Sequence, residues 1–233
     1  MITIFTLTYN EEIFIKFMID HYRSRFPECN IVVYDNKSTD KTVEIAEANN
    51  CEVRAYDSGG TLDDGLHMNM KNSIWKTANT NWVLVCDLDE LLDINEQDLI
   101  NEEKLGTTKI NSEGWDMLNM EDNFDIGSIK FGVRSTMYDK LMLFNKQHIF
   151  ETNYGAGCHD CHPIGIIKDS FKAYRMFHYK YINENFVVQR YKITASRLSE
   201  ANKKNNWGHQ TLMPEEDMRD YISKLKTMSV KIL

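Results

Sequence analysis

Hydrophobic and polar positions along the first 93 residues form blocks that match strands and helices. Continuous β-branched and apolar runs predict buried strands, and apolar residues three or four positions apart predict the helices between them. The predicted strands are residues 2–8, 30–34, 51–56 and 82–86, and the predicted helices lie between a cap at Asn10 and Pro27, over 43–49 and over 66–78. This alternating order predicts an α/β fold with a parallel sheet and right-handed crossovers.

The second half of the chain is less regular. Residues 107–128 mix glycine, asparagine, serine and acidic residues, a composition that predicts loops and short strands. Strand patterns follow at 129–133, 141–145 and 172–179, and helical patterns at 183–204 and 214–226.

Two carboxylates, Asp87 and Asp89, follow the fourth predicted strand. In extended backbone, side chains two positions apart point to the same face. Because ligands in open α/β sheets bind beyond the carboxyl ends of the strands, we expect both side chains at a ligand site. Their oxygens suit Mg²⁺ or Mn²⁺, which in turn could hold a diphosphate. Asp-x-Asp alone is common in solvated turns, so the buried strand before it is what gives this pair its weight.

Composition narrows the partners and the compartment. The net charge of −8 disfavours nucleic acid as a partner, and a phosphorylated substrate would need a local cation such as the metal. No apolar run of about 18 residues predicts a membrane span, and the N-terminal residues lack a signal-peptide pattern, so we expect a cytoplasmic location. Five scattered cysteines favour a reducing compartment over a disulfide scaffold.

Three motifs stand at the ends of predicted strands: residues 8–11 (Thr-Tyr-Asn-Glu), 35–40 (Asp-Asn-Lys-Ser-Thr-Asp) and 87–90 (Asp-Leu-Asp-Glu). In this order and spacing the chain resembles the family-2-like glycosyltransferases of the A-fold, in particular short, metal-dependent enzymes of the large-virus type with an Asp-x-Asp-Glu motif. The resemblance covers residues 2–93 well and the remainder loosely. It implies a Rossmann-like, mostly parallel sheet flanked by helices, an irregular acceptor-side second half and C-terminal helices.

The resemblance also implies one glycosyltransferase domain over residues 1–233. Its nucleotide-binding half would cover 1–93, its acceptor-side half 94–182 and its C-terminal helices 183–233. The implied activity is transfer of a sugar from a nucleotide-diphospho-sugar, UDP-linked by expectation, to a hydroxyl of a glycan or another acceptor. Mn²⁺ or Mg²⁺ would assist, and the mechanism would be inverting. The sugar, the acceptor and the oligomeric state stay open.

Site residues follow from the same resemblance. It implies that the nucleoside pocket is lined by Thr8, Tyr9 and Asn10, that Asp35 reaches the base or ribose, and that Asp87, with Leu88 beside it, lies on the ribose or metal side. The metal would be held by Asp89 and His178, with Asp87 as a further ligand. Asp35 could also be a turn residue or a helix cap, and His178 a core histidine. Lys71 could bind phosphate, although Lys71 and Lys76 on one helix more often mark a solvated face.

The segment Cys158-His159-Asp160-Cys161-His162 offers several kinds of chemistry. It matches the pattern for c-type haem attachment, but the chain has no export signal, and no second Cys/His pair follows at zinc-finger spacing. An inverting transfer needs a base to take the proton of the acceptor hydroxyl. We expect Asp160 to be this base, with His159 or His162 as substitutes and Asp139, Glu121 and Asp116 as further candidates.

Two other functions compete with glycosyl transfer. A nucleotidyltransferase would also use a Rossmann-like sheet and Mg²⁺, but it should carry a glycine-rich loop with Lys or Arg after the first strand, where this chain has residues 8–12 without glycine. A non-catalytic module that binds nucleotide sugars would tolerate the loss of the base.

Overall fold

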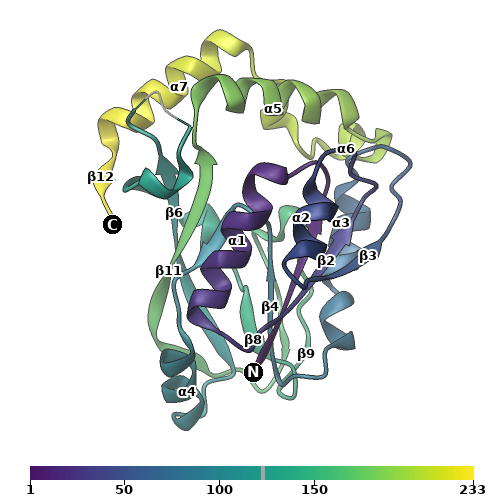
Figure 1. The fold of residues 1–233 in the computed structure, drawn as a ribbon, viewed down its shortest axis with the longest axis vertical. Coiled ribbons are helices and arrows are strands. Elements are labelled where there is room, and N and C mark those ends of the chain that lie inside the picture. The colour runs from purple at the N-terminus through teal and green to yellow at the C-terminus, as the bar shows by residue number, and fades with distance from the viewer. Residues whose placement is uncertain (122–123) are drawn as a thin grey trace.

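A computed structural model of the chain describes residues 1–121 and 124–233 (Figure 1). Its strands are β1 (Ile2–Thr8), β2 (Asn30–Asp35), β3 (Glu52–Ala55), β4 (Trp82–Cys86), β5 (Glu90–Leu92), β6 (Lys109–Leu118), β7 (Phe131–Arg134), β8 (Leu143–Asn145), β9 (Ile149–Glu151), β10 (Ile164–Gly165), β11 (Asp169–Tyr181) and β12 (Val230–Lys231). Its α-helices are α1 (Glu12–Arg25), α2 (Thr42–Ala48), α3 (Asp64–Lys71), α4 (Glu96–Lys104), α5 (Glu184–Arg197), α6 (Glu200–Asn205) and α7 (Glu215–Met228). Short 3₁₀ helices are η1 (Ile74–Thr77), η2 (Ile126–Ser128), η3 (Thr136–Tyr138), η4 (Ala156–Cys158) and η5 (His209–Leu212).

The first four strands form the parallel part of the sheet, as the sequence pattern predicts. β1 pairs in parallel with β2 and with β4, and β2 pairs in parallel with β3. Alternate residues of β4 enter different core clusters: Trp82 and Leu84 pack on one side, Val83 and Val85 on the other. Both faces of the sheet are therefore covered at β4, and this strand is a continuous apolar run for that reason.

The described residues extend this sheet to ten strands. Their order is β12-β7-β6-β8-β4-β1-β2-β3, and β11 pairs with β6 in parallel and with β5 antiparallel. The fold is thus α/β, with a mostly parallel mixed sheet flanked by helices, as expected.

The prediction of loops and short strands for residues 107–128 is wrong over β6, which is ten residues long. Residues 122–123 of that stretch lie outside the described residues. The inward positions of β6 include Ser112, Gly114 and Asp116, so the strand has no hydrophobic alternation to reveal it. The hydroxyl of Ser112 is satisfied by the carbonyl of Lys140 at 2.7 Å, and a Cβ at Gly114 would lie 2.4 Å from Tyr138. Hydrogen bonds and close packing hold this face instead of apolar burial.

Two helices are shorter than their patterns predict. The stretch 66–78 contains α3, which ends at Lys71, and then η1. The stretch 183–204 is divided between α5 and α6 because Leu198 forms an isolated parallel bridge with Leu62. The N–H of Leu62 donates to the carbonyl of Arg197 at 2.6 Å, and the N–H of Ser199 donates to the carbonyl of Leu62 at 2.9 Å. This bridge ties the C-terminal segment to the loop before α3.

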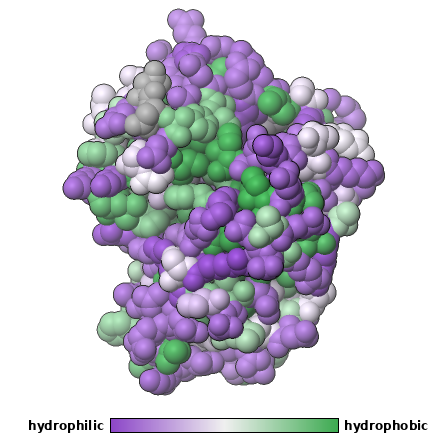
Figure 2. All heavy atoms as spheres, in the orientation of Figure 1, coloured by the Kyte–Doolittle hydropathy of each residue, from purple (hydrophilic) through white to green (hydrophobic). Residues whose placement is uncertain are grey.

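In Figure 1, α5 lies across the upper end of the molecule, above α1, α2 and α3. On the same face in Figure 2, hydrophobic side chains gather in the upper middle, and hydrophilic side chains cover most of the remaining surface. Among the described residues, no helix has both the length and the apolar character that crossing a membrane would require.

Candidate active site

A cavity of about 500 Å³ opens at the carboxyl ends of β1, β2 and β4 and is covered by α5. Its lining includes all three motif segments, through residues such as Tyr9, Asn36 and Asp89. The late strand β11 and the loop that carries η4 complete the wall, through His178 and Cys158 among others. Parts of the chain that are far apart in sequence therefore meet at this strand edge, where open α/β sheets bind ligands.

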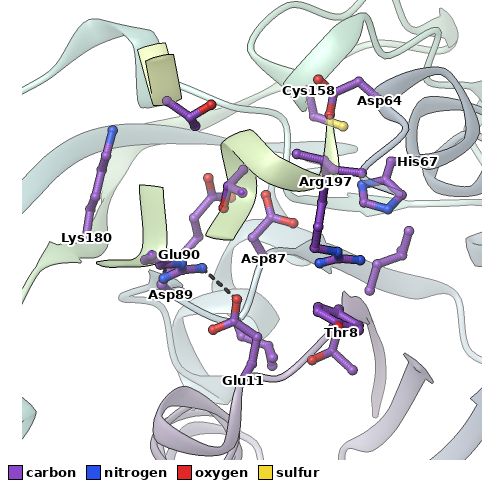
Figure 3. Close-up of a pocket in the computed structure, with 18 of the residues that line it drawn as sticks. Thr8, Glu11, Asp64, His67, Asp87, Asp89, Glu90, Cys158, Lys180 and Arg197 are labelled. Carbon is purple, nitrogen blue, oxygen red and sulfur yellow. Dashed lines mark hydrogen bonds and ion pairs between the residues drawn. The ribbon is translucent and has the colours of Figure 1, made fainter. Parts of the chain in front are cut away.

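Asp87 and Asp89 both line the cavity, but they stand in a tight turn and not in extended backbone. The N–H of Glu90 donates to the carbonyl of Asp87 at 3.1 Å, which closes the turn between β4 and β5. The expectation of an extended segment is wrong, although both carboxylates reach the same cavity (Figure 3). Leu88 between them is buried and packs into the hydrophobic core.

Asp87 is paired with Lys71, whose ammonium lies 2.6 Å from Oδ1. Lys71 is only 6% exposed, so the solvated-face interpretation of this lysine is wrong. Burial alone would raise the pKa of Asp87, but Lys71 and Lys140 outweigh it and hold that pKa well below the ordinary range. Asp87 is therefore a carboxylate anion with a cation fixed beside it.

Glu90 and Lys140 form a second pair next to the first. Lys140 donates to Oε1 of Glu90, and both side chains are 4% exposed. The ammonium of Lys140 also lies 4.0 Å from Oδ2 of Asp87. Lys140 is thus shared between two acidic side chains that start and end the turn.

Arg190 links α5, which covers the cavity, to two acidic residues that follow strands of the sheet. One guanidinium nitrogen donates to Oδ2 of Asp89 at 3.1 Å, and the other donates to Oε1 of Glu11 at 2.7 Å. Burial raises the pKa of Glu11 to about 7, although Arg190 acts in the opposite direction. Burial would also raise the pKa of Asp89, but Arg190 and His178 hold it below its ordinary value. Neither Arg190 nor Lys140 is marked by a sequence signal, because their partners are distant in sequence.

His178 lies beside Asp89 and is 5% exposed. Its Nδ1 is 2.7 Å from Oδ1 of Asp116, so a hydrogen on Nδ1 is donated to that carboxylate. Its Nε2 is 3.8 Å from Oδ2 of Asp89, and the ring lies against Tyr138 with 4.0 Å between ring centroids. A carboxylate that fixes the far nitrogen of a histidine is the usual support of a metal-binding imidazole.

The donors present fit a divalent metal in part. An oxygen of Asp89 and Nε2 of His178 converge, and Asp116 orients the imidazole. In the part of the chain that the structure describes, no group of three Asp, Glu, His or Cys side chains could hold a metal ion. The protein would therefore supply two ligands, and bound substrate or water would supply the others.

The opposite end of the cavity is lined by Thr8, Tyr9 and Asn10. The hydroxyl of Thr8 is buried and has no hydrogen-bond partner among the described residues. The guanidinium of Arg197 lies 3.3 Å from the ring centroid of Tyr9. Asn10 does not cap α1 as expected: its φ is 53°, and its side-chain oxygen accepts from the N–H of Thr39 at 2.7 Å.

Asp35 lies beneath this end and is not among the lining residues. It is 6% exposed, and its carboxylate accepts from the N–H of Ser38 at 3.0 Å, as a turn residue would. The next residue, Asn36, lines the cavity in its place.

The two candidate bases of the acceptor side occupy different positions. Asp160 is exposed and lies against Gly155, outside the lining of the cavity. His159 stands at the rim, lines the cavity and has its ring 5.3 Å from that of Tyr138. Its Nδ1 is 3.1 Å from the carbonyl of Met137, which can only accept, so Nδ1 carries the hydrogen and Nε2 is left as a base. Partial burial and the neighbouring Lys140 lower the pKa of His159 to about 4.

Residues 3–175 match the sequence profile described as glycosyl transferase family 2. The chain belongs to this family. The members of this family are glycosyl transferases. A comparison with curated proteins gives no match.

Solved structures with a similar fold include other glycosyltransferases. TarS of S. aureus is 16% identical over 87% of this chain and 41% of its own, with a TM-score of 0.45. TarS residues 1–349 in complex with UDP-GlcNAc is 16% identical over 88% of this chain and 70% of its own, with a TM-score of 0.42. The mannosyltransferase PcManGT of Pyrobaculum calidifontis, in complex with GDP-Man and Mn²⁺, is 12% identical over 96% of this chain and 73% of its own, with a TM-score of 0.48. The family-2 chain thus spans less than half the length of TarS.

Proposed function

We propose that the protein transfers a sugar from a UDP-sugar to a hydroxyl group of an acceptor, with a divalent metal and with inversion at the anomeric carbon. Membership of glycosyl transferase family 2 supports the reaction class. The observation that carries the metal dependence is the alignment of Asp116, His178 and Asp89, with 2.7 Å and 3.8 Å between their polar atoms.

We assign the metal to Asp89 and His178, with Mn²⁺ favoured over Mg²⁺. Mg²⁺ prefers oxygen ligands alone, whereas Mn²⁺ accepts an imidazole. When bound, the metal would neutralise negative charge that develops on the departing diphosphate. Asp89 has the imidazole of His178 beside it, whereas the two oxygens of Asp87 face Lys71 and Lys140. We therefore place Asp87 on the donor side, outside the metal ligand set.

The donor's nucleoside is assigned to the end of the cavity that contains Thr8, Tyr9 and Asn10. The unpartnered hydroxyl of Thr8 supports this, because a buried polar group without a partner is costly unless a ligand satisfies it. The Tyr9 ring, with Arg197 against it, offers a flat surface for stacking. Lys71 would then face the diphosphate from the side of Asp87.

For the base that accepts the acceptor proton we propose His159 in place of Asp160. His159 lines the cavity and keeps a free Nε2, whereas Asp160 lies outside it. A neutral imidazole at the rim can take a proton as the acceptor hydroxyl attacks the anomeric carbon.

Nucleotide release from a panel of UDP- and GDP-sugars, with Mn²⁺, Mg²⁺ or EDTA, tests the proposal. We expect Mn²⁺-dependent release of UDP from at least one UDP-sugar, and pyrophosphate from none. Release of UDP that is equally fast in EDTA would refute the metal assignment. Pyrophosphate formation, or binding without turnover with every donor and acceptor tried, would refute the reaction.

A further inference from the structure

Lys180 is a cation in the cavity wall that the proposed chemistry does not use. It is half-buried and lines the cavity two residues beyond His178 on β11. The other cations close to the carboxylates are neutralised: Lys71 by Asp87, Lys140 by Glu90, and Arg190 by Asp89 and Glu11. For Lys180, no carboxylate lies within ion-pair distance among residues 1–121 and 124–233.

The ammonium of Lys180 is held in place by two aromatic rings. It lies 5.3 Å from the ring centroid of Tyr181 and 5.2 Å from that of Tyr191 on α5. Contacts of this kind orient an ammonium but leave its charge uncompensated, because a ring offers only a partial negative face. A lysine that interacts only with solvent gains nothing from a position in the cavity wall.

An irregularity in β11 gives Lys180 this position. His178 pairs with Asp116 and Tyr181 pairs with Leu118, so two residues of β11 stand opposite one residue of β6. Such a bulge redirects side chains and is common beside active sites. Here it allows Tyr181 to pack into the cluster beneath α5 and α7 while Lys180 remains in the cavity.

The position of Lys180 separates it from the nucleoside end. In Figure 3, Lys180 stands on one side of the carboxylates Asp87, Asp89 and Glu90, and Arg197 stands on the other. Arg197 lies with Tyr9, where the nucleoside is proposed to bind. A ligand that contacts Lys180 would thus approach the reacting centre from the side opposite the nucleoside.

We infer that Lys180 is the anion-binding residue of an acceptor subsite, and that the acceptor carries a phosphate or carboxylate group near the hydroxyl that is glycosylated. The inference rests on the proposed function, because it takes the donor to fill the cavity from the nucleoside end to His178. An ammonium without a carboxylate partner in a half-enclosed site forms a stronger hydrogen bond with an anion than with a water molecule. It discriminates against a neutral analogue, because such a ligand leaves the positive charge unsatisfied.

The test uses inorganic phosphate and acetate as the simplest anions, titrated into the enzyme saturated with UDP and Mn²⁺ and followed by calorimetry. Saturation with UDP is measured first and reports on the proposed function alone. We expect phosphate or acetate to bind the UDP complex, and Lys180→Met to weaken that binding about tenfold or more, while Lys180→Arg retains it. The control is Lys224→Met, an exposed lysine of α7, which should leave anion affinity unchanged.

Three results would contradict the inference. If UDP binds but neither anion binds the complex, no acceptor anion site exists. If saturation with UDP abolishes anion binding, Lys180 belongs to the diphosphate site. If Lys180→Met leaves the affinity unchanged, the anion binds elsewhere. Failure of UDP to bind at all would instead refute the proposed function. Preference for phosphate over acetate would identify the acceptor as phosphorylated, and the reverse would identify it as a carboxylic acid.

Discussion

Arg190 donates to Asp89 at 3.1 Å although 101 positions separate the two residues in the sequence. The same guanidinium donates to Glu11 at 2.7 Å, so one cation from α5 pairs with two acidic side chains that follow different strands. Arg190 thereby connects α5, which covers the cavity, to Asp89, the carboxylate to which we assign the metal. Stability of the fold and occupation of the site by a cation should be coupled as a result.

Arg190→Gln should lower the free energy of unfolding by about 2 kcal/mol at pH 7, because it leaves Asp89 and Glu11 largely buried without a cation. Added Mn²⁺ should restore more stability to this variant than it adds to the wild type, since the freed carboxylates gain a ligand. Urea denaturation with and without Mn²⁺ measures both effects.

Arg219→Gln is the matched control for that experiment. Arg219 contacts Glu184 and Glu215, but these side chains are 33% and 43% exposed, and exposed pairs contribute about 0–1 kcal/mol. A loss in Arg219→Gln as large as that in Arg190→Gln would show that the position of Arg190 has no special importance.

Substitutions at Asp89, His178 and Asp116 should distinguish the side chains that bind the metal directly from the one that orients a ligand. We expect Asp89→Asn and His178→Gln each to abolish the Mn²⁺ dependence of UDP binding. Asp116→Asn should weaken Mn²⁺ affinity about 10–100-fold, because it acts only through the orientation of His178. Calorimetry with UDP and Mn²⁺ gives these affinities, and Asp20→Asn, on the exposed face of α1, serves as the control. If UDP binding by His178→Gln depends on Mn²⁺ as it does in the wild type, His178 is a core histidine and not a metal ligand.

The pair of Glu90 and Lys140 can be tested by a double-mutant cycle. Glu90→Gln and Lys140→Met should each destabilise the protein by about 3–5 kcal/mol, because each leaves a charge buried alone. The double variant should lose about 2 kcal/mol less than the sum, since neither charge then remains. The exposed pair Lys16 and Asp20, treated in the same way, should show a coupling of about 0.5 kcal/mol or less. Additive losses at Glu90 and Lys140 would contradict the pairing.

The sequence predicts the part of the fold in which burial repeats regularly. The strands β1, β2 and β4 have apolar runs because both of their faces are buried, and the ends of β1 and β4 locate Tyr9 and Asp89 at one edge. The pattern does not reveal β6 because its inward face includes Ser112, Gly114 and Asp116 between Ile110 and Leu118, and these three residues are held by hydrogen bonds and close packing. Patterns of hydrophobicity carry no information about such a strand.

The candidate site shows the same division. Asp87 and Asp89 could be located because they follow a recognisable strand. Lys140 and Arg190 could not, since their pairing depends on contacts between segments 50 and 101 positions apart. The pattern favours a solvated face over phosphate binding for Lys71, because the helix predicted over residues 66–78 also contains Lys76, which is indeed exposed toward Glu151. The partner of Lys71 is visible only after β4 and α3 are packed together.

Acid should destabilise the protein through His21, which is held neutral. Burial lowers the pKa of His21 to about 4, although the carbonyl of Leu92, 3.0 Å from Nε2, acts in the opposite direction. The unfolded chain binds this proton below about pH 6.5 while the folded chain does not until about pH 4. The stability is therefore fully present above pH 6.5 and falls as the pH is lowered toward 4, by about 1.4 kcal/mol per pH unit at most.

His21→Gln should remove this contribution while its amide can still donate to Leu92. Between pH 7 and pH 5 the variant should lose about 2 kcal/mol less than the wild type in urea denaturation. Equal losses in the two proteins would mean that His21 does not carry the proton-linked step.

The assignment of the base rests on the contrast between His159 and Asp160, which are adjacent in sequence but differ in position. His159→Gln should lower kcat about 10²–10⁴-fold with little change in the KM for the donor, because the base acts on the acceptor proton in the transition state. The kcat of Asp160→Asn should stay within a few-fold of the wild-type value, since its carboxylate lies outside the cavity.

The pH dependence of the rate tests the same assignment independently. Because the pKa of His159 in the free protein is about 4, the base is already deprotonated at pH 5, and the acidic limb of kcat/KM should fall near pH 4 and not near 6.5. A large loss in Asp160→Asn with His159→Gln nearly intact would return the role to the aspartate, and the loop that carries both would then have to rearrange when the donor binds.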